Sequence, residues 1–514
     1  MFIKVSLLLV FFAVTIFVGL YFRKKASSVN DFVLGGRNVG PWLSAFSYGA
    51  TYFSAVVFVG YAGQFGWRFG TSAVWIGLGN AFIGSLMAWL ILGRRTRIMT
   101  NHLMSATMPQ FFGSRYVSPS LKIGASIIVF VFLIPYTASL YNGLSRLFAM
   151  AFGVPFEYCI WAMGILTAVF VVVGGYFATA VNDFIQGTIM LIGIAAIVAV
   201  VLRDNGGFTA AIDSLARIEE PALSPGVYAS FFGPDPVSLL GVLILTSLGV
   251  WGLPQMVARF YSIKSEKMIS KGAIVSTIFA FIIAGGCYFL GSFGRLYSDV
   301  VERSASGSVV YDSIIPTILS GFSEMMIGLV VVLVFAASIS TLSSLVMASA
   351  STLTLDFLKG FVIGKISDKK QLVIIRILIV VFILISSVIA IIQYRGGITF
   401  IAQLMGVSWG VLAGAFLAPF LYGLYWKRAS KISVWCCFLF STGIMTLNIV
   451  FRSSFPLILQ SPINAGAFTM LAGLIIVPLV SIFTKAPDRA LVDNYFSCYD
   501  EEVKVKVKEA LGNN

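Results

Sequence analysis

The stretch WLSAFSYGATYFSAVVFVGYAGQFGW, residues 42–67, contains no charged residue. It is long enough to cross a membrane as a helix, which takes about 20 apolar residues. It is nevertheless an unusual span, because Gly49, Gly60 and Gly63 interrupt it and hydroxyl side chains lie between them. Unwound backbone at membrane depth is tolerated only where it lines a cavity and not lipid. The stretch therefore predicts a membrane span that is broken near its middle.

A second stretch, VSLLGVLILTSLGVWGLPQ at residues 237–255, has the same character, with three glycines and Pro254. The two stretches are the first members of two sets of five predicted spans, spans 2–6 and spans 7–11. Because each set has an odd number of spans, the sets cross the membrane in opposite senses. Interrupted spans at matching positions of inverted repeats point to a binding site near the membrane midplane. The alternative is that these glycines only permit close helix packing, but the matching positions favour broken helices.

The composition fits a protein that is embedded in a lipid bilayer. Of 514 residues, 58% are hydrophobic and 11% charged, and the mean hydropathy is +0.95. A soluble protein carries about 25% charged residues. The net charge of +14 does not indicate nucleic-acid binding, because the basic residues lie in short loops between apolar runs, where positive charge sets membrane orientation.

The apolar runs predict an all-α membrane protein with thirteen transmembrane helices in a single domain, residues 1–514. The predicted spans are 3–22, 42–66, 73–92, 123–143, 159–174, 181–202, 236–253, 273–294, 326–348, 377–394, 398–423, 432–451 and 464–484. If the N-terminus is outside, 26 of the 35 Lys and Arg residues fall in cytoplasmic segments, as the positive-inside rule requires. We therefore expect a plasma (inner) membrane protein with a cytoplasmic tail at 485–514.

The ninth predicted span contains AASISTLSS, residues 336–344, in which four of the five residues at 340–344 carry a hydroxyl group. Helical spacing places Ala337, Ser340, Thr341 and Ser344 on one face, with Ser343 at its border. Neutral hydroxyl and carbonyl oxygens suit a monovalent cation, whereas calcium prefers a cage of carboxylates. The alternative is that each hydroxyl bonds to the carbonyl one turn earlier in its own helix.

Asp183 opens the sixth predicted span and, apart from Lys4, is the only ionisable residue within the predicted limits. Charged residues inside a membrane are costly and usually functional. Because Asp183 lies within one turn of the predicted cytoplasmic end, it could instead be an interfacial charge near a helix N-terminus. The sequence alone leaves both interpretations open.

Motifs for enzyme chemistry or ATP hydrolysis are missing. The chain has no GxxxxGK[ST] phosphate loop and no GxGxxG motif after a strand. It has one histidine, and its five cysteines lack the paired spacing of a zinc site. We therefore expect a protein that is not an enzyme and whose transport is driven by an ion gradient.

Several short motifs together resemble the sodium/solute symporter family along nearly the whole chain. They are DFVLGGR at 31–37, Gly40-Pro41, Gly174-Gly175, Asp183 with Gln186-Gly187, Gly252 with Pro254, Arg259-Phe260, STLS at 340–343 and GLYWKRA at 423–429. The resemblance implies thirteen spans, LeuT-type inverted five-helix repeats with broken helices, and sodium as the co-transported ion. It implies a small-molecule solute as the other cargo and no obligate protein partner.

The same resemblance implies which residues bind sodium. The main sodium ion would lie between the second and ninth spans, on the carbonyls of Ala50, Phe53 and Ala337 and the hydroxyls of Ser340 and Thr341. Some members of the family bind a second sodium ion, and its positions here are Asp183, Ser340, Ser343 and Ser344.

Within the family, the chain looks most similar to the sodium/pantothenate and monocarboxylate-type branch. The motifs that indicate this are ATY at 50–52, Asn182-Asp183, MLIG at 190–193 and GVWGLP at 249–254. The proline branch has an aspartate in place of Tyr52 and an aromatic residue in place of Val250. The prediction is thus a sodium symporter for a small carboxylate such as pantothenate, with a proline-type amino-acid symporter, or a receptor or channel on the same scaffold, as alternatives. The expected solute-binding residues are Thr51, Tyr52, Ser54, Tyr136, Trp251 and Gln403.

Overall fold

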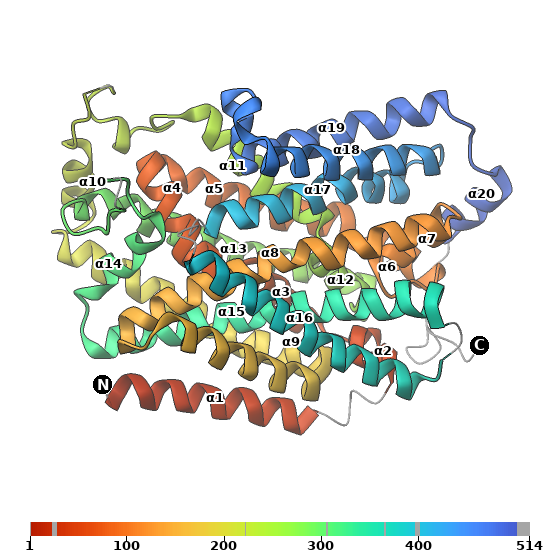
Figure 1. Cartoon of the computed structure of the whole chain (residues 1–514), viewed down its shortest axis with the longest axis horizontal. Helices are drawn as coiled ribbons and strands as arrows, with labels where there is room; N and C mark the ends of the chain where they lie inside the picture. Colours follow the sequence, from red (N-terminus) through yellow and green to blue (C-terminus); the bar gives the residue numbers. More distant parts are fainter. Residues whose placement is uncertain are drawn as a thin grey trace.

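The computed structural model describes residues 2–22, 28–221, 223–304, 307–363, 366–395 and 401–500. In these ranges the chain forms helices joined by loops, and most of the long helices run along the long axis of the molecule (Figure 1). The long helices are α1 (Phe2–Phe22), α8 (Pro119–Phe152), α9 (Phe156–Asp204), α13 (Ile269–Ser292), α15 (Glu324–Thr352), α16 (Asp368–Arg395), α17 (Ile401–Tyr425), α18 (Lys431–Val450) and α19 (Pro462–Phe483).

Shorter helices break or connect these long ones. They are α2 (Val29–Leu34), α3 (Pro41–Tyr52), η3 (Val56–Tyr61), α4 (Ala62–Phe69), α5 (Val74–Gly79), η5 (Asn80–Met87), α6 (Arg94–His102), α7 (Met108–Arg115), α10 (Phe208–Ala216), α11 (Pro236–Ser247), η8 (Gly249–Gly252), α12 (Pro254–Tyr261), η11 (Tyr311–Ser313), α14 (Ile314–Ser320), η12 (Leu353–Ile363) and α20 (Arg489–Ser497).

The predicted all-helical membrane architecture is confirmed, but the count of thirteen spans is not. Within the described ranges, ten helices are long and apolar enough to cross a membrane, or eleven if the bent pair α11–η8 and α12 forms one span. Two of the ten, Val56–His102 with 47 residues and Phe156–Asp204 with 49, are each more than twice the length of one crossing. The number thirteen therefore stays a prediction.

The predicted break in the second span is present at Phe53. Helix α3 ends at Tyr52, and Phe53 adopts an extended conformation with φ −107° and ψ 118°. The chain turns helical again after Ser54, whose carbonyl accepts the backbone N–H of Val57 at 2.9 Å and of Phe58 at 3.0 Å. The break leaves the buried residues Phe53 and Ser54 outside any regular helix.

The matching break in the seventh predicted span lies at Leu253. This residue is extended, with φ −86° and ψ 120°, because a residue before proline is disfavoured in the helical region. Helix α12 then begins at Pro254, bent by 46° from the preceding helix. If the bent pair is one span, that span extends past the predicted limit of 236–253 to Tyr261 and includes Arg259.

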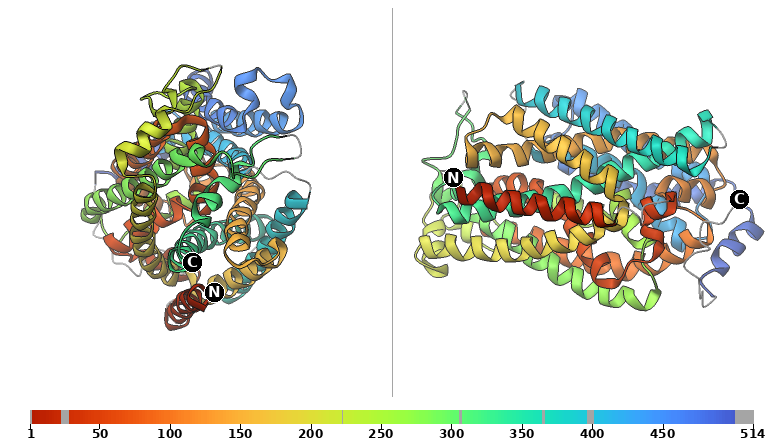
Figure 2. Two further views of the ribbon diagram at one scale, coloured as in Figure 1. Left: turned by 90° about the vertical axis from the view of Figure 1, so that its left-hand side faces the viewer. Right: turned by 90° about the horizontal axis from the view of Figure 1, so that it is seen from below.

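Helices α15 and α17 form the interior of the bundle. In each, 83% of the membrane-spanning window is buried inside the protein, compared with 28% in α1. Helix α15 packs against α8 and α9, and α17 packs against α8, α18 and α19. Helix α1 lies at the edge of the bundle in the views of Figures 1 and 2. The hydroxyl-rich face of α15 is thus enclosed by protein and not by lipid.

The first part of the predicted tail at 485–514 is a docked helix, α20. Asp493 of α20 pairs with Lys427 at 2.7 Å, and the guanidinium carbon of Arg115 lies 5.2 Å from the ring of Phe496. These contacts hold α20 against the end of the bundle opposite the N-terminus of α1 (Figure 1). The rest of the predicted tail, 501–514, lies outside the described residues.

Candidate ion and solute site

The face of α15 that was predicted to bind sodium meets the broken second span at Thr341. The Thr341 hydroxyl oxygen lies 3.3 Å from the carbonyl oxygen of Ala50, 3.2 Å from that of Thr51 and 3.1 Å from that of Ala337. A hydroxyl has one hydrogen to donate, so this cluster holds more acceptor oxygens than protons. Such a group of neutral oxygens fits a monovalent cation.

The other two residues predicted for the main sodium site are placed differently. Phe53 is fully buried and forms the break itself. In the sequence, its carbonyl group follows those of Ala50 and Thr51 by only a few residues. The Ser340 hydroxyl instead donates to Oδ1 of Asp183 at 2.6 Å. Ser340 therefore joins the Asp183 cluster, which adjoins the Thr341 cluster along the same helix.

Asp183 lies deep inside the protein, on α9, with no exposed surface. Its carboxylate accepts hydrogen bonds from Ser340 and from Ser47 of α3. It also forms an ion pair with Arg259 of α12, with 3.4 Å between Oδ2 and a guanidinium nitrogen. An interfacial charge would be solvated, so the burial of Asp183 argues against that interpretation.

Arg259 joins this cluster to both broken spans. It is only 2% exposed, and the nitrogen that faces Asp183 also donates to the Thr51 hydroxyl at 2.6 Å and to the Ser344 hydroxyl. The ring of Tyr176 covers the guanidinium at 5.1 Å. A buried charge without a partner is strongly destabilising, so Asp183 and Arg259 depend on each other.

The last two predicted ligands of a second sodium ion, Ser343 and Ser344, also bond within their own helix. Ser343 donates to the carbonyl of Ile339 at 2.7 Å, and Ser344 donates to that of Ser340 at 3.0 Å. The alternative of hydrogen bonding one turn back thus describes Ser343 fully. Ser344 has in addition its contacts with Thr51, at 3.1 Å, and Arg259.

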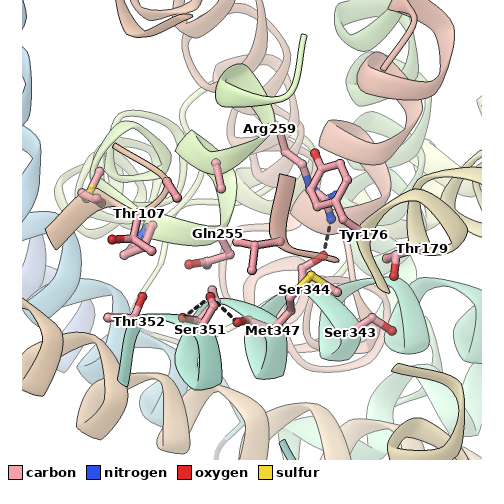
Figure 3. A pocket seen from close by; sticks show the side chains of 16 residues that line it. Thr107, Tyr176, Thr179, Gln255, Arg259, Ser343, Ser344, Met347, Ser351 and Thr352 are labelled. Atoms are coloured by element: carbon pink, nitrogen blue, oxygen red, sulfur yellow. Dashed lines mark hydrogen bonds between the residues drawn. The ribbon is translucent and has the colours of Figure 1, made fainter. Parts of the chain in front are cut away.

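A small cavity of about 40 Å³ lies beside this cluster. In Figure 3 it extends along α15 from Arg259 and Ser344 toward Thr107 and Thr352. Its walls carry polar and apolar groups from α9, α12 and α15: Tyr176, Thr179, Gln255, Arg259, Ser343, Ser344, Met347, Ser351 and Thr352. Ala106 and Thr107, in the loop between α6 and α7, line the same cavity.

Two of the predicted solute-binding residues lie against a third aromatic residue near the first break. The ring of Tyr52 stacks on Trp409 of α17 at 6.3 Å, and the ring of Tyr136 of α8 meets Trp409 edge-on at 5.9 Å. The Tyr52 hydroxyl donates to the carbonyl of Thr246 at 2.6 Å. This aromatic group joins the end of α3 at the first break to α8, α11 and α17.

The remaining predicted solute-binding residues have structural partners of their own. Thr51 belongs to the Arg259 cluster, and the Ser54 hydroxyl accepts the backbone N–H of Val56 at 3.3 Å. The indole N–H of Trp251 donates to the carbonyl of Ile83 at 3.0 Å. The amide oxygen of Gln403, on the first turn of α17, accepts from Arg452 at 3.3 Å.

Sequence reasoning missed five residues that line or complete the site: Ser47, Tyr176, Gln255, Arg259 and Trp409. Arg259 belongs to a family motif but was not predicted to lie in the site, because the predicted seventh span stopped at 253. Ser47 lies one turn before Thr51 on the same helix, and that spacing was a usable signal. Nothing in the sequence pairs Tyr176 with Arg259.

The helical bundle, the paired breaks and the cluster of buried oxygens together define a secondary transporter of the membrane. The chain belongs to the Sodium:solute symporter family, whose model matches residues 32–433. This is a family of multi-pass transporters with sodium as the co-transported ion.

Relatives named as proline transporters match most of the chain. The osmoregulated proline transporter OpuE of Bacillus subtilis is 28% identical over 484 residues, 94% of this chain and 95% of its own length. The sodium/proline symporter 2 of Staphylococcus saprophyticus is 29% identical over 435 residues, 83% of this chain and 82% of its own length. The predicted likeness to the pantothenate and monocarboxylate branch is therefore not confirmed.

Solved structures agree on the fold. A Na⁺-coupled sialic acid symporter in an outward-open state superposes with a TM-score of 0.74 at 17% identity, covering 95% of this chain and 99% of its own. Mhp1, a nucleobase-cation-symport-1 family transporter, superposes with a TM-score of 0.51 at 15% identity, covering 90% and 97%. These neighbours have the LeuT-like fold that the sequence predicted.

Proposed function

We propose that this protein is a sodium-driven symporter that imports a small amino acid of the proline type. The observation that supports this most is the match of relatives named as proline transporters along up to 94% of the chain. The geometry is compatible with such a solute, because the buried rings of Tyr52, Tyr136 and Trp409 pack together beside the first break, and aromatic faces pack well on a small apolar ring. The unwound backbone at both breaks offers N–H and C=O groups to a zwitterion.

A carboxylate without an amine, such as pantothenate, is the second candidate. The observation that favours it is Tyr52, whose hydroxyl is bonded to the carbonyl of Thr246. Tyr52 stands where the proline branch has an aspartate, so an acidic partner for a substrate amine is missing at this position.

Uptake of labelled solutes into proteoliposomes separates the two candidates. We expect an imposed sodium gradient to drive uptake of labelled L-proline, and excess unlabelled proline to compete more strongly than pantothenate or a three-carbon monocarboxylate. Sodium-driven uptake of pantothenate without uptake of proline would contradict the first proposal and support the second. Vesicles with potassium in place of sodium are the control.

We propose two sodium sites. The main site consists of Ala50, Phe53, Ala337 and Thr341, and Ser340 contributes to it from its place beside Asp183. The second site consists of Asp183, Ser340, Ser343 and Ser344, with Ser343 as the weakest member because its hydroxyl is bonded within α15.

We expect Asp183→Asn to lower the Hill coefficient for sodium from about two toward one, because the only carboxylate of the second site is lost. The Hill coefficient of sodium-activated uptake would be measured in both proteins. An unchanged coefficient in Asp183→Asn would rule out the second site.

We also propose thirteen crossings with the N-terminus outside and the C-terminus in the cytoplasm. In support, the helices of 47 and 49 residues contain Gly70 and Gly175, both with positive φ, where the chain can turn back. Counting each as two crossings and adding the bent pair to the ten helices gives thirteen.

Single cysteines at Asp299 and Asn494, in a background without native cysteines, test this topology. A membrane-impermeant maleimide should label Asp299→Cys in intact cells and Asn494→Cys only after lysis. The reverse pattern would contradict the orientation.

A further inference from the structure

The guanidinium of Arg259 occupies a position that is surrounded by oxygens from three helices. One of its nitrogens contacts Asp183 Oδ2 of α9 at 3.4 Å, Thr51 Oγ1 of α3 at 2.6 Å and the Ser344 hydroxyl of α15. Two of these three partners, Asp183 and Ser344, are residues of the proposed second sodium site. The arginine and a sodium ion would therefore use the same oxygens.

Charge makes simultaneous use of these oxygens unfavourable. Asp183 is fully buried and Arg259 is 2% exposed, so the pair is close to neutral in a low-dielectric interior. A sodium ion bound to Asp183 would place a second positive charge within a few ångströms of the guanidinium. Repulsion between like charges is strong where water does not screen it.

We infer that Arg259 is a tethered cation that competes with sodium for the oxygens of Asp183 and Ser344. The inference rests on the proposed second sodium site and adds a residue that regulates it. When sodium binds, the guanidinium leaves Asp183; when sodium leaves, the guanidinium returns and keeps the buried carboxylate neutralised. The carrier can then reorient without sodium and without an uncompensated buried charge.

The cavity beside Arg259 gives the displaced guanidinium a place to go. Gln255 and Arg259 lie one turn apart on α12, and both line this cavity (Figure 3). In the described part of the chain, the Gln255 side-chain oxygen and the Arg259 Nε are buried atoms without a hydrogen-bond partner. The hydroxyls of Ser351 and Thr352 line the same cavity. A small rotation of the Arg259 side chain would thus replace contacts with Asp183 by contacts with neutral oxygens.

Sodium binding to the purified protein tests the competition directly. We would measure equilibrium binding of ²²Na⁺ in the wild type, Arg259→Gln and Arg115→Gln. Removing the tethered cation should tighten sodium binding at the second site by about tenfold or more, because one repelling charge is gone. Arg115 is an equally buried arginine that donates to the carbonyls of Gly423 and Trp426, so Arg115→Gln should bind sodium as the wild type does. Unchanged or weaker binding in Arg259→Gln would overturn the inference.

A second variant guards against a folding defect. Arg259→Ala, purified in buffer with guanidinium ion at about 10 mM, should bind sodium more weakly in guanidinium than after its removal, whereas the wild type should not respond. The absence of any guanidinium effect on Arg259→Ala would contradict competition.

The number of sodium ions bound tests the proposed second site separately from the role of Arg259. If Asp183→Asn binds as many sodium ions as the wild type, the site itself is wrong. If Asp183→Asn loses one ion while Arg259→Gln shows no tighter binding, only the role of Arg259 is wrong.

Discussion

At the scale of single residues, the centre of this protein contains hydroxyl groups that each contact more than one neighbouring polar group. Thr341 touches carbonyl oxygens of α3 and of its own helix, and Ser344 touches Thr51 and Arg259. Hydroxyls with several acceptors nearby can turn from protein partners to a cation at low cost, because each keeps an oxygen lone pair available.

Thr341→Ala removes one hydroxyl from the oxygen cluster between α3 and α15. We expect the sodium concentration for half-maximal uptake to rise roughly tenfold, since a hydrogen bond or ligand contact to a charged group contributes about 1.5 kcal/mol or more. Thr341→Ser keeps the hydroxyl and should stay close to the wild type. Sodium-activation curves in proteoliposomes measure both, and equal curves for Thr341→Ala and the wild type would remove Thr341 from the site.

Asp312 lies outside the candidate membrane spans, and its protonation should make the stability of the protein depend on pH. It is 1% exposed, and burial raises its pKa from 3.8 to about 7, although Arg146 and the backbone N–H of Ile401 lower it. A raised carboxyl pKa means that the folded protein binds this proton more tightly than the unfolded chain does. The contribution of Asp312 to stability is therefore full below about pH 4 and is lost as the pH rises to about 7.

We expect Asp312→Asn, which stays neutral, to raise the thermal midpoint at pH 8 by a few degrees and to flatten its fall between pH 5.5 and 8. The exposed loop residue Asp299 offers the control Asp299→Asn, which should follow the wild type. Midpoints of the detergent-purified proteins at both pH values measure the effect. A wild-type slope in Asp312→Asn would assign the pH dependence to other groups.

At the scale of elements, breaks were predictable wherever Gly or Pro makes them, and contacts between distant elements were not. The glycines of both spans and Pro254 are enough to indicate that each span is broken. The pairing of Asp183 with Arg259 joins α9 to α12, and no periodicity along one helix reveals which residue of another helix it faces. The predicted seventh span stopped at 253, directly before Pro254, so Arg259 was left outside it and its buried partner was not predicted.

Gly175 shows how one residue can set the course of an element. It lies inside α9 with φ 63° and ψ −170°, a conformation that is essentially restricted to glycine. We expect Gly175→Ala to destabilise the protein by about 1–3 kcal/mol and to lower its thermal midpoint. Gly153 also has positive φ, but at φ 66° and ψ 21° and with no atom within 4 Å of an added Cβ, so Gly153→Asn should change the midpoint little. Equal midpoints for Gly175→Ala and the wild type would mean that the turn at 175 is not rigid.

At the scale of the whole molecule, hydrophobic runs predicted the membrane class, and motifs predicted the family. The solute branch was not predictable in the same way, because it depends on a few side chains near the breaks. Tyr52 and Val250 suggested one branch, whereas relatives along nearly the full chain are named for proline. Two substitutions near a pocket weigh little against similarity spread over the bundle, and only transport measurements give the solute itself.

The number of sodium ions per solute decides how much work the transporter performs. One sodium ion that enters down 100 mV gains about 2.3 kcal/mol, and a tenfold gradient adds about 1.4 kcal/mol. For a zwitterion such as proline, one sodium ion would thus support accumulation of several hundredfold, and two would support about 10⁵-fold. We expect two positive charges to enter with each proline, because we propose one sodium site at the Thr341 cluster and a second at the Asp183 cluster. The ratio of charge to proline can be measured in proteoliposomes at a calibrated membrane potential. Substrate-evoked current gives the charge, and labelled uptake in the same preparation gives the proline. Asp183→Asn should lower the ratio from about two to about one, whereas Asn494→Ala, on the exposed face of α20, should leave it unchanged. A ratio of one in the wild type would leave Asp183 and Arg259 as a structural ion pair and the Thr341 cluster as the single sodium site.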